Sequence, residues 1–116
     1  MSMAAKKSTR VTRRYKRYIV NGSVVLQGTR GESRGTLLNL GQGGILVRTD
    51  TAEPQGVDIT VLFDVAGYLE TFAMKGQVVG INGTLLAIKF LDDLDMAFLL
   101  LLDWLDFQHC TWSGVA

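Results

Sequence analysis

Residues 68–90 read YLETFAMKGQVVGINGTLLAIKF and predict two antiparallel strands joined by a tight turn. Asn82-Gly83 stands between two stretches of strand-forming residues, and Asn-Gly is favoured in two-residue hairpin turns. Gly76 or Gly80 inside the longer strand permits a bulge or a sharp bend, because glycine has no side chain to pack there. We therefore expect a chain built from antiparallel hairpins.

Further strands are expected upstream of this hairpin, separated by turns that contain glycine. Asn21-Gly22 predicts a turn or a bulge, and Ala66-Gly67 predicts a hairpin turn. Gly28, Gly31 and Gly35 indicate a polar loop that holds Arg30, Glu32 and Arg34. Six or seven short strands are typical of an antiparallel barrel or sandwich. The expected strands are residues 18–20, 24–26, 36–38, 45–49, 57–65, 68–81 and 84–90.

The C-terminal part has a different pattern. Residues 96–107 (MAFLLLLDWLDF) contain no Gly, Pro or β-branched residue, which favours a helix. Asp92-Asp93-Leu94-Asp95 supplies an N-cap candidate. At the helical period the aspartates share an arc of about 80°, and the rest of the surface is apolar. The simplest interpretation is a helix that closes an open barrel end. A wider hypothesis is that its far side also pairs with a second copy, as a homodimer.

Length and composition restrict the class of protein. One hundred and sixteen residues make one domain, and 47% apolar with 20% charged residues indicates a globular chain. Cys110, the single cysteine, excludes a disulfide framework and a multi-cysteine zinc site. No stretch approaches the roughly 20 apolar residues of a membrane span. The N-terminus lacks the apolar core of a signal peptide, so we expect a cytoplasmic protein.

Charge is distributed unevenly along the chain. Residues 1–34 carry nine Lys/Arg and one acid, whereas residues 35–116 carry three Lys/Arg and ten acids. This asymmetry suggests that the N-terminal third meets an anion, although a solvated basic tail is the alternative. The densest stretch contains Lys6, Lys7, Arg10, Arg13, Arg14, Lys16 and Arg17.

Catalysis finds little support in the sequence. A single histidine, His109, offers no metal pair, and the chain has neither a phosphate loop ending in Gly-Lys-Ser nor a Gly-x-Ser-x-Gly elbow. Adjacent helix positions do not face each other, so His109 and Cys110 do not form a nucleophile pair. We expect no enzyme, no metal and no cofactor.

Two elements suit an anionic, flat ligand. Arg13 and Arg17 are four residues apart, and each guanidinium offers a planar donor fork that matches a phosphate or a guanine edge. Residues 39–44 (NLGQGG) add an amide that both donates and accepts. Their three glycines allow positive φ angles and backbone N–H groups close to an anion.

Together these elements resemble the PilZ domain, whose motifs are RxxxR and (D/N)xSxxG. Arg13-x-x-x-Arg17 and Asn39-x-Gly41-x-x-Gly44 stand in the same order, and the resemblance extends from about Arg10 to Phe107. It implies a bacterial, mostly β protein: a six-stranded antiparallel barrel with a C-terminal helix that binds the second messenger cyclic di-GMP. The corresponding boundaries are a flexible basic arm over 1–9, the domain over 10–108 and a C-terminal tail over 109–116.

The resemblance also assigns residues to the ligand. Arg13 and Arg17 would grip guanine and phosphate, Asn39 would bind a guanine edge, and Gly44 would stand where the backbone meets the ligand. Arg10 and Arg14 would add phosphate or stacking contacts. Gly41 departs from the family pattern, because the usual residue there is serine. Loss of that hydroxyl is expected to weaken binding by about 0.5–1.5 kcal/mol.

The leading hypothesis is therefore a cyclic di-GMP receptor and adaptor. Its arginine arm would close over the dinucleotide on the barrel surface, and the complex would signal to an unidentified downstream protein in trans. One alternative is a degenerate PilZ-like interaction domain that binds no nucleotide. Another is a small nucleic-acid-binding barrel, but Tyr15 and Tyr18 are the only aromatics near the basic segment, so we expect no DNA partner.

Overall fold

The computed structural model describes residues 16–29, 31–50 and 53–115, and these form six strands and one helix. The elements are β1 (Arg17–Gly28), β2 (Gly31–Gly41), β3 (Gly44–Thr49), β4 (Asp58–Asp64), β5 (Thr71–Asn82), β6 (Leu85–Phe90) and α2 (Met96–Val115).

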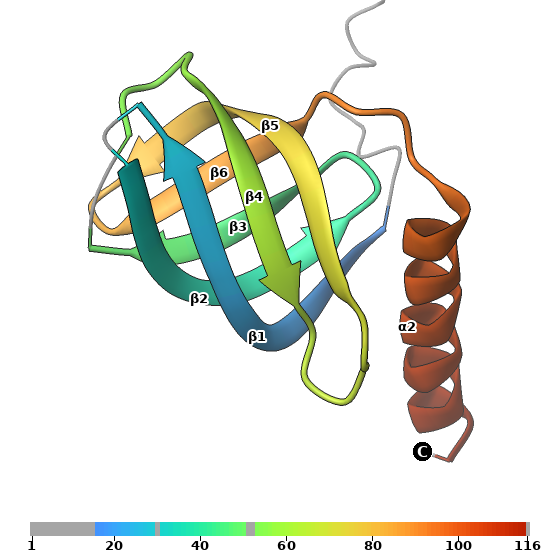
Figure 1. Cartoon of the computed structure of the whole chain (residues 1–116). Helices are drawn as coiled ribbons and strands as arrows, with labels where there is room; N and C mark the ends of the chain where they lie inside the picture. The colour runs from blue at the N-terminus through green and yellow to red at the C-terminus, as the bar shows by residue number, and fades with distance from the viewer. Residues whose placement is uncertain (1–15, 30, 51–52, 116) are drawn as a thin grey trace, which may run out of the picture.

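The strands close into a barrel in the order β1-β2-β3-β6-β5-β4. Every neighbouring pair is antiparallel, and β1 closes the ring because it pairs with both β2 and β4. The helix α2 stands at one end of the barrel, close to the start of β1 (Figure 1). The expected six-stranded antiparallel barrel with a C-terminal helix is therefore confirmed.

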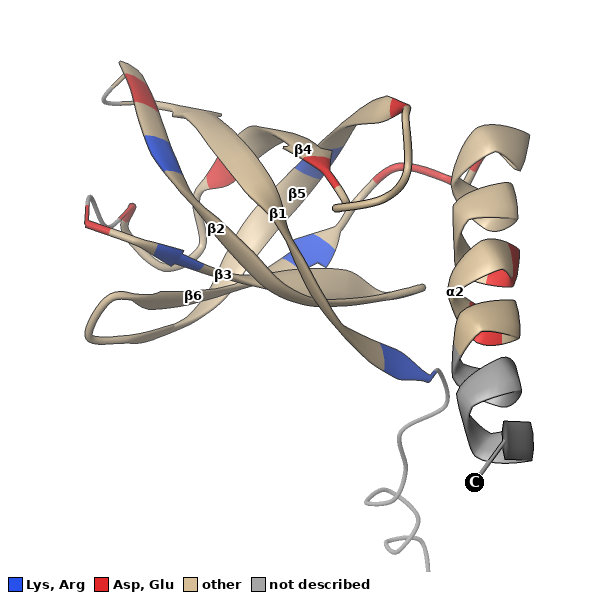
Figure 2. Ribbon diagram, turned by 90° about the horizontal axis from the view of Figure 1, so that it is seen from below, with Lys and Arg blue, Asp and Glu red and all other residues tan. Residues whose placement is uncertain are grey.

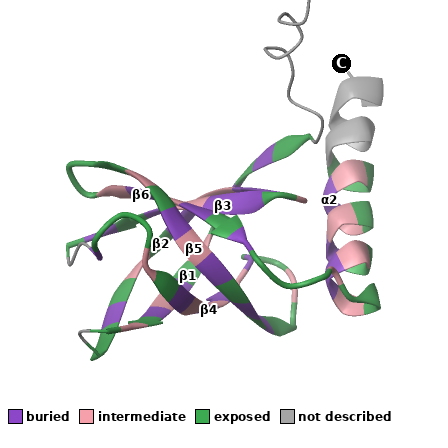
Figure 3. Cartoon of the chain, turned by 90° about the horizontal axis from the view of Figure 1, so that it is seen from above, coloured by how far each residue is buried: buried purple, intermediate pink, exposed green. Residues whose placement is uncertain are grey.

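Alternation of side chains explains how the strands build the core. In β4 the residues Ile59, Val61 and Phe63 are buried, and the residues between them are partly exposed. The same period of two recurs in β1, where Val24 and Leu26 are buried. Successive side chains of a strand point to opposite faces, so one set of each strand fills the barrel interior. Figure 3 shows this alternation of buried and exposed residues along the strands.

Two bulges and one turn follow the glycine pattern. The β1–β2 register shifts between Ile19 and Gly22, and the β5–β6 register shifts between Val78 and Gly80. Gly83 has a φ of 62° in the β5–β6 turn, a conformation that glycine adopts without steric cost. The bulges expected near Gly22 and Gly80 and the hairpin at Gly83 are thus confirmed.

The polar loop expected around Gly28 to Gly35 was a wrong prediction. β1 extends to Gly28 and β2 begins at Gly31, so the two strands form one continuous hairpin. Gln27 lies opposite Glu32, and its Nε2 donates to Glu32 Oε2 at 3.0 Å. Gln27, Glu32 and Arg34 occupy exposed positions of this ladder, whereas Ser33 is buried. The pattern of polar residues and glycines did not distinguish such a ladder from a loop.

Helix α2 begins with the expected N-cap. Asp95 Oδ1 accepts a hydrogen bond from the backbone N–H of Phe98 at 2.9 Å, which satisfies one of the unpaired donors of the first turn. Asp92 contributes differently, because its Oδ2 accepts from the backbone N–H of Lys75 at 2.8 Å and ties the linker to β5. The helix continues to Val115, beyond the end expected at Phe107.

One face of α2 closes the barrel end. Phe98, Leu101 and Leu105 lie on that face and are almost fully buried. The Phe98 ring meets three aromatic rings of the barrel edge-on, with centroid distances of 5.5 to 6.3 Å. The closing role proposed for the helix is therefore confirmed. Within the described part of the chain, no helix combines the length and hydrophobicity needed to cross a bilayer.

Candidate functional site

The last residue of the first predicted motif meets the second motif at the start of β1. Arg17 is the first residue of β1 and pairs with Gly41 of β2, while Ile19 pairs with Asn39. Arg17 and Asn39 are therefore diagonal neighbours. Arg17 Nε donates to Asn39 Oδ1 at 3.1 Å, and its Nη2 donates to the same oxygen. A charged fork and an amide thus occupy one point on the barrel surface.

Ile19 adds an apolar surface to this point, which the sequence did not single out. Its side chain is 85% exposed, although isoleucine is usually found inside proteins. It lies directly opposite Asn39 in the β1–β2 ladder and two residues from Arg17. The outer face at this place therefore offers a cation, an amide and an exposed apolar side chain. Arg10, Arg13 and Arg14 lie outside the described residues.

Gly41 is required by the close approach of two strands. A Cβ atom at this position would lie 2.6 Å from the carbonyl oxygen of Lys16, well inside van der Waals contact. A serine at this position needs β1 and β2 to separate at their ends. Glycine at this position therefore permits the close approach between Gly41 and the residue that precedes β1.

Close packing between strands also explains the glycine at position 44, whereas the sequence predicted a contact with the ligand there. Gly44 is buried in β3, and an added Cβ would collide with the carbonyl oxygen of Ile88 in β6. The expectation of positive φ at the three motif glycines was wrong, because Gly41, Gly43 and Gly44 are not among the positive-φ glycines of the described residues. Gly41 and Gly44 belong to extended strands, where the absence of a side chain matters more than backbone freedom.

A groove of about 600 Å³ lies beside the motifs, between α2 and the barrel end. Tyr18 contributes from β1, Lys16 from the residue before β1, and Gln42 from the glycine-rich turn. The helix supplies apolar side chains and two acids, Asp103 and Asp106. The groove therefore connects the motif-bearing strand ends with the C-terminal helix.

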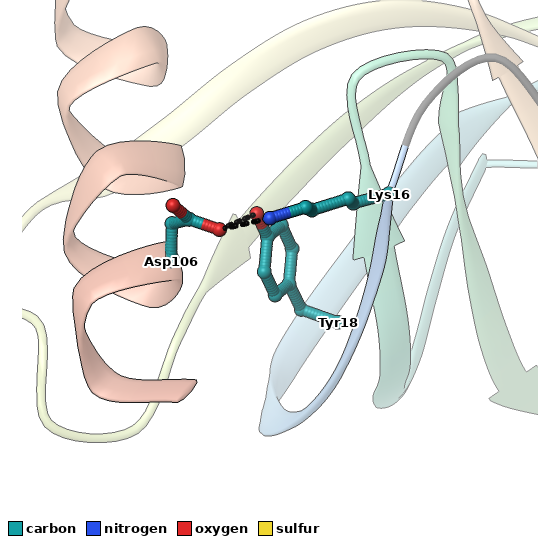
Figure 4. Close-up of polar contacts among 3 residues, drawn as sticks. All are labelled: Lys16, Tyr18 and Asp106. Carbon is teal, nitrogen blue, oxygen red and sulfur yellow. Dashed lines mark hydrogen bonds and ion pairs between the residues drawn. The ribbon is translucent and has the colours of Figure 1, made fainter. Parts of the chain in front are cut away.

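A polar contact crosses this groove. Asp106 Oδ1 accepts a hydrogen bond from the Lys16 ammonium at 2.7 Å and another from the Tyr18 hydroxyl at 3.0 Å (Figure 4). No local pattern in the sequence predicts this contact, because the partners are about 90 residues apart and aspartates on a helix are usually solvated. Only the docking of α2 brings them together.

The charged residues of α2 differ from those of the barrel. Lys, Arg, Asp and Glu segments are spread over the strands, whereas the coloured segments of α2 are all acidic (Figure 2). Two of these acids, Asp103 and Asp106, line the groove. No group of three His, Cys, Asp or Glu side chains within the described ranges is arranged to hold a metal ion.

Comparisons with known proteins agree with this architecture. The family model of the PilZ domain matches residues 12–106. A solved structure described as the PilZ domain with c-di-GMP of YcgR from Escherichia coli is similar in fold, with a TM-score of 0.70 and 16% sequence identity. The similarity covers 91% of this chain and 100% of that one. No curated protein matches the chain.

Proposed function

The chain belongs to the PilZ domain family, and from that premise we propose that it is a receptor for cyclic di-GMP that acts by binding and has no catalytic activity. One observation carries the proposal: Arg17 of the first motif and Asn39 of the second motif are in direct contact on the outer face of the barrel. One ligand can therefore contact both side chains. The E. coli domain of similar fold was solved with c-di-GMP, which supports the choice of ligand.

The chemistry of these groups matches a dianionic dinucleotide. A guanidinium binds a phosphate or the O6 and N7 atoms of guanine through two parallel hydrogen bonds. Arg17 donates to a neutral amide in this structure, and a charged phosphate oxygen is a stronger acceptor than that amide. Exchange of partners releases the Asn39 amide for a guanine edge. The exposed Ile19 side chain provides apolar contact for a base face.

The arm that precedes β1 supplies the remaining cations of the proposed site. In this hypothesis Arg10, Arg13 and Arg14 join Arg17 around the ligand, and the ordering of the arm is the signal that a downstream protein reads. Ordering costs conformational entropy, which the charge-assisted contacts must offset. We place this receptor in the bacterial cytoplasm, where cyclic di-GMP acts as a second messenger.

Isothermal titration of the full chain with cyclic di-GMP tests the proposal. We expect binding to cyclic di-GMP and none to GTP or cyclic GMP at the same concentrations. Arg17→Ala should weaken binding about tenfold or more, because a hydrogen bond to a charged group is lost. Arg48→Ala is a matched control, since Arg48 is an exposed arginine of β3 outside both motifs. Far-UV circular dichroism checks that both variants fold.

The close approach at Gly41 favours a second candidate function. If the tight pairing of β1 with β2 leaves no room for the nucleotide, the domain acts through protein contacts alone. A flat titration with a correctly folded chain would establish this alternative. The same result would contradict the proposed role of Arg17 in ligand binding.

A homodimer through α2 remains part of the proposed function. Met96, Leu100 and Phe107 are between 52% and 69% exposed on the helix, although large apolar residues are more often buried. A second copy of the helix would cover them. Light scattering at micromolar concentration should give twice the chain mass of 12.7 kDa, and a strictly monomeric mass would count against the dimer.

A further inference from the structure

Helix α2 contacts the residues immediately before and after Arg17, a residue of the proposed ligand site. Asp106 Oδ1 accepts from Lys16 Nζ at 2.7 Å and from the Tyr18 hydroxyl at 3.0 Å. Lys16 and Tyr18 are the two sequence neighbours of Arg17. One carboxylate oxygen therefore holds the chain immediately before and immediately after the arginine that reaches Asn39 (Figure 4).

The alternation of side chains along a strand explains how contacts of Lys16 and Tyr18 can affect Arg17. Neighbouring side chains point to opposite faces, so Lys16 and Tyr18 face α2 while Arg17 faces the outer surface. Anchoring the side chains of the first and third of three consecutive residues restricts the backbone at the second. The Arg17 side chain leaves this restricted backbone, and its guanidinium donates to Asn39.

The helix segment that carries the carboxylate is packed against the barrel. Leu105, the neighbour of Asp106, is 4% exposed and packs into the core that α2 forms with the barrel. Tyr18 is 8% exposed, so its ring is also packed. The side chains of Lys16 and Asp106 are 71% and 43% exposed, and exposed ion pairs contribute little to stability. Orientation of β1 is therefore the effect of this contact that the structure supports best.

We propose that Asp106 is a positioning residue of the ligand site, which acts through Lys16 and Tyr18 to hold Arg17 toward Asn39. The inference rests on the proposed function for its ligand, but the positioning itself is a property of the ligand-free chain. It makes the C-terminal helix a part of the binding site, although no residue of α2 belongs to either motif. Preorganisation of this kind raises affinity because fewer conformations are lost on binding.

Asp106→Asn is the principal variant, because an amide keeps the size of the side chain and removes its charge. We expect cyclic di-GMP binding to weaken about three- to tenfold, the range for ordering one side chain with many rotamers. Asp103→Asn is the matched control. Asp103 lines the same groove from the preceding turn, and no hydrogen bond or ion pair joins it to another described residue. Its variant should bind like the wild type.

A second measurement does not depend on the nucleotide. The 15Nε–1Hε signal of Arg17, identified by its loss in Arg17→Lys, reports the order of the guanidinium by NMR relaxation. We expect an ordered signal in the ligand-free wild type and in Asp103→Asn, and a mobile one in Asp106→Asn. Asp106→Glu should restore part of the order, because the longer side chain keeps a negatively charged acceptor, whereas the amide of Asp106→Asn offers the Lys16 ammonium and the Tyr18 hydroxyl only a neutral and weaker one.

These readouts separate the two proposals. A wild type that binds no nucleotide but loses Arg17 order in Asp106→Asn would overturn the proposed ligand and keep the positioning role. An Arg17 signal equally ordered in the wild type and in Asp106→Asn would overturn the positioning role, whatever the affinity. If Asp106→Asn fails to fold, Tyr18→Phe replaces it, since the ring keeps its packing and only the hydroxyl contact with Asp106 is removed.

Discussion

Replacing Gly41 with the serine that is usual in the family should lower the stability of this protein. In the structure an added Cβ lies 2.6 Å from the carbonyl oxygen of Lys16, whereas ordinary van der Waals contact begins near 3.4 Å. Gly41→Ser therefore requires the start of β1 to move by about 0.8 Å. Overpacking of this kind typically costs about 1–3 kcal/mol of unfolding free energy.

The displaced segment includes the ligand site, because Gly41 is the register partner of Arg17. Any gain from the new hydroxyl, about 0.5–1.5 kcal/mol, is therefore opposed by a shift of the guanidinium away from Asn39. We expect Gly41→Ser to bind cyclic di-GMP no more tightly than the wild type and to unfold at a lower urea concentration.

Two further variants separate the steric effect from the hydroxyl. Gly41→Ala carries the Cβ without the hydroxyl and should lose as much stability as Gly41→Ser. Gly80→Ala places a Cβ at 3.5 Å from that of Ala87, an ordinary contact, and should leave unfolding nearly unchanged. Urea titration and isothermal titration measure both quantities. A Gly41→Ser protein that is as stable as the wild type and binds the nucleotide more tightly would refute the steric argument.

Two other predictions concern α2. Phe98→Ala should lower the unfolding free energy by about 3–5 kcal/mol, because the ring is 1% exposed and its removal leaves a cavity at the barrel end. A loss below about 1 kcal/mol in urea titration would mean that the helix does not close the barrel in solution. Asp95→Ala should cost about 1 kcal/mol through loss of the N-cap, and Asp95→Asn should cost less because the amide oxygen also caps. Equal thermal stability of wild type and Asp95→Ala would contradict the capping role.

Local signals in the sequence predicted the elements whose geometry depends on neighbouring residues. The Asn82-Gly83 turn, the bulges near Gly22 and Gly80 and the helix beginning after Asp95 all follow from short-range conformational preferences. The β1–β2 hairpin was interpreted as a loop, because polar residues at outward strand positions have the composition of a loop.

Contacts between distant segments could not be predicted in this way. The distance between Gly41 and Lys16 depends on how two strand ends pair, and the approach of Asp106 to Tyr18 depends on where α2 docks. The family resemblance identified Arg17 and Asn39 as candidates, but their hydrogen bond and the exposed Ile19 beside them required the three-dimensional structure. No pattern in a single sequence encodes such separations directly.

Closure of the barrel restricts how another protein can recognise it. Each of the six strands is hydrogen-bonded to a neighbour on either side, so the ring has no edge strand. A partner cannot extend the sheet with a strand of its own, which is a common way for proteins to capture extended peptides. Recognition of this barrel must instead depend on side chains, on the turns at its rims and on the outer surface of the terminal helix.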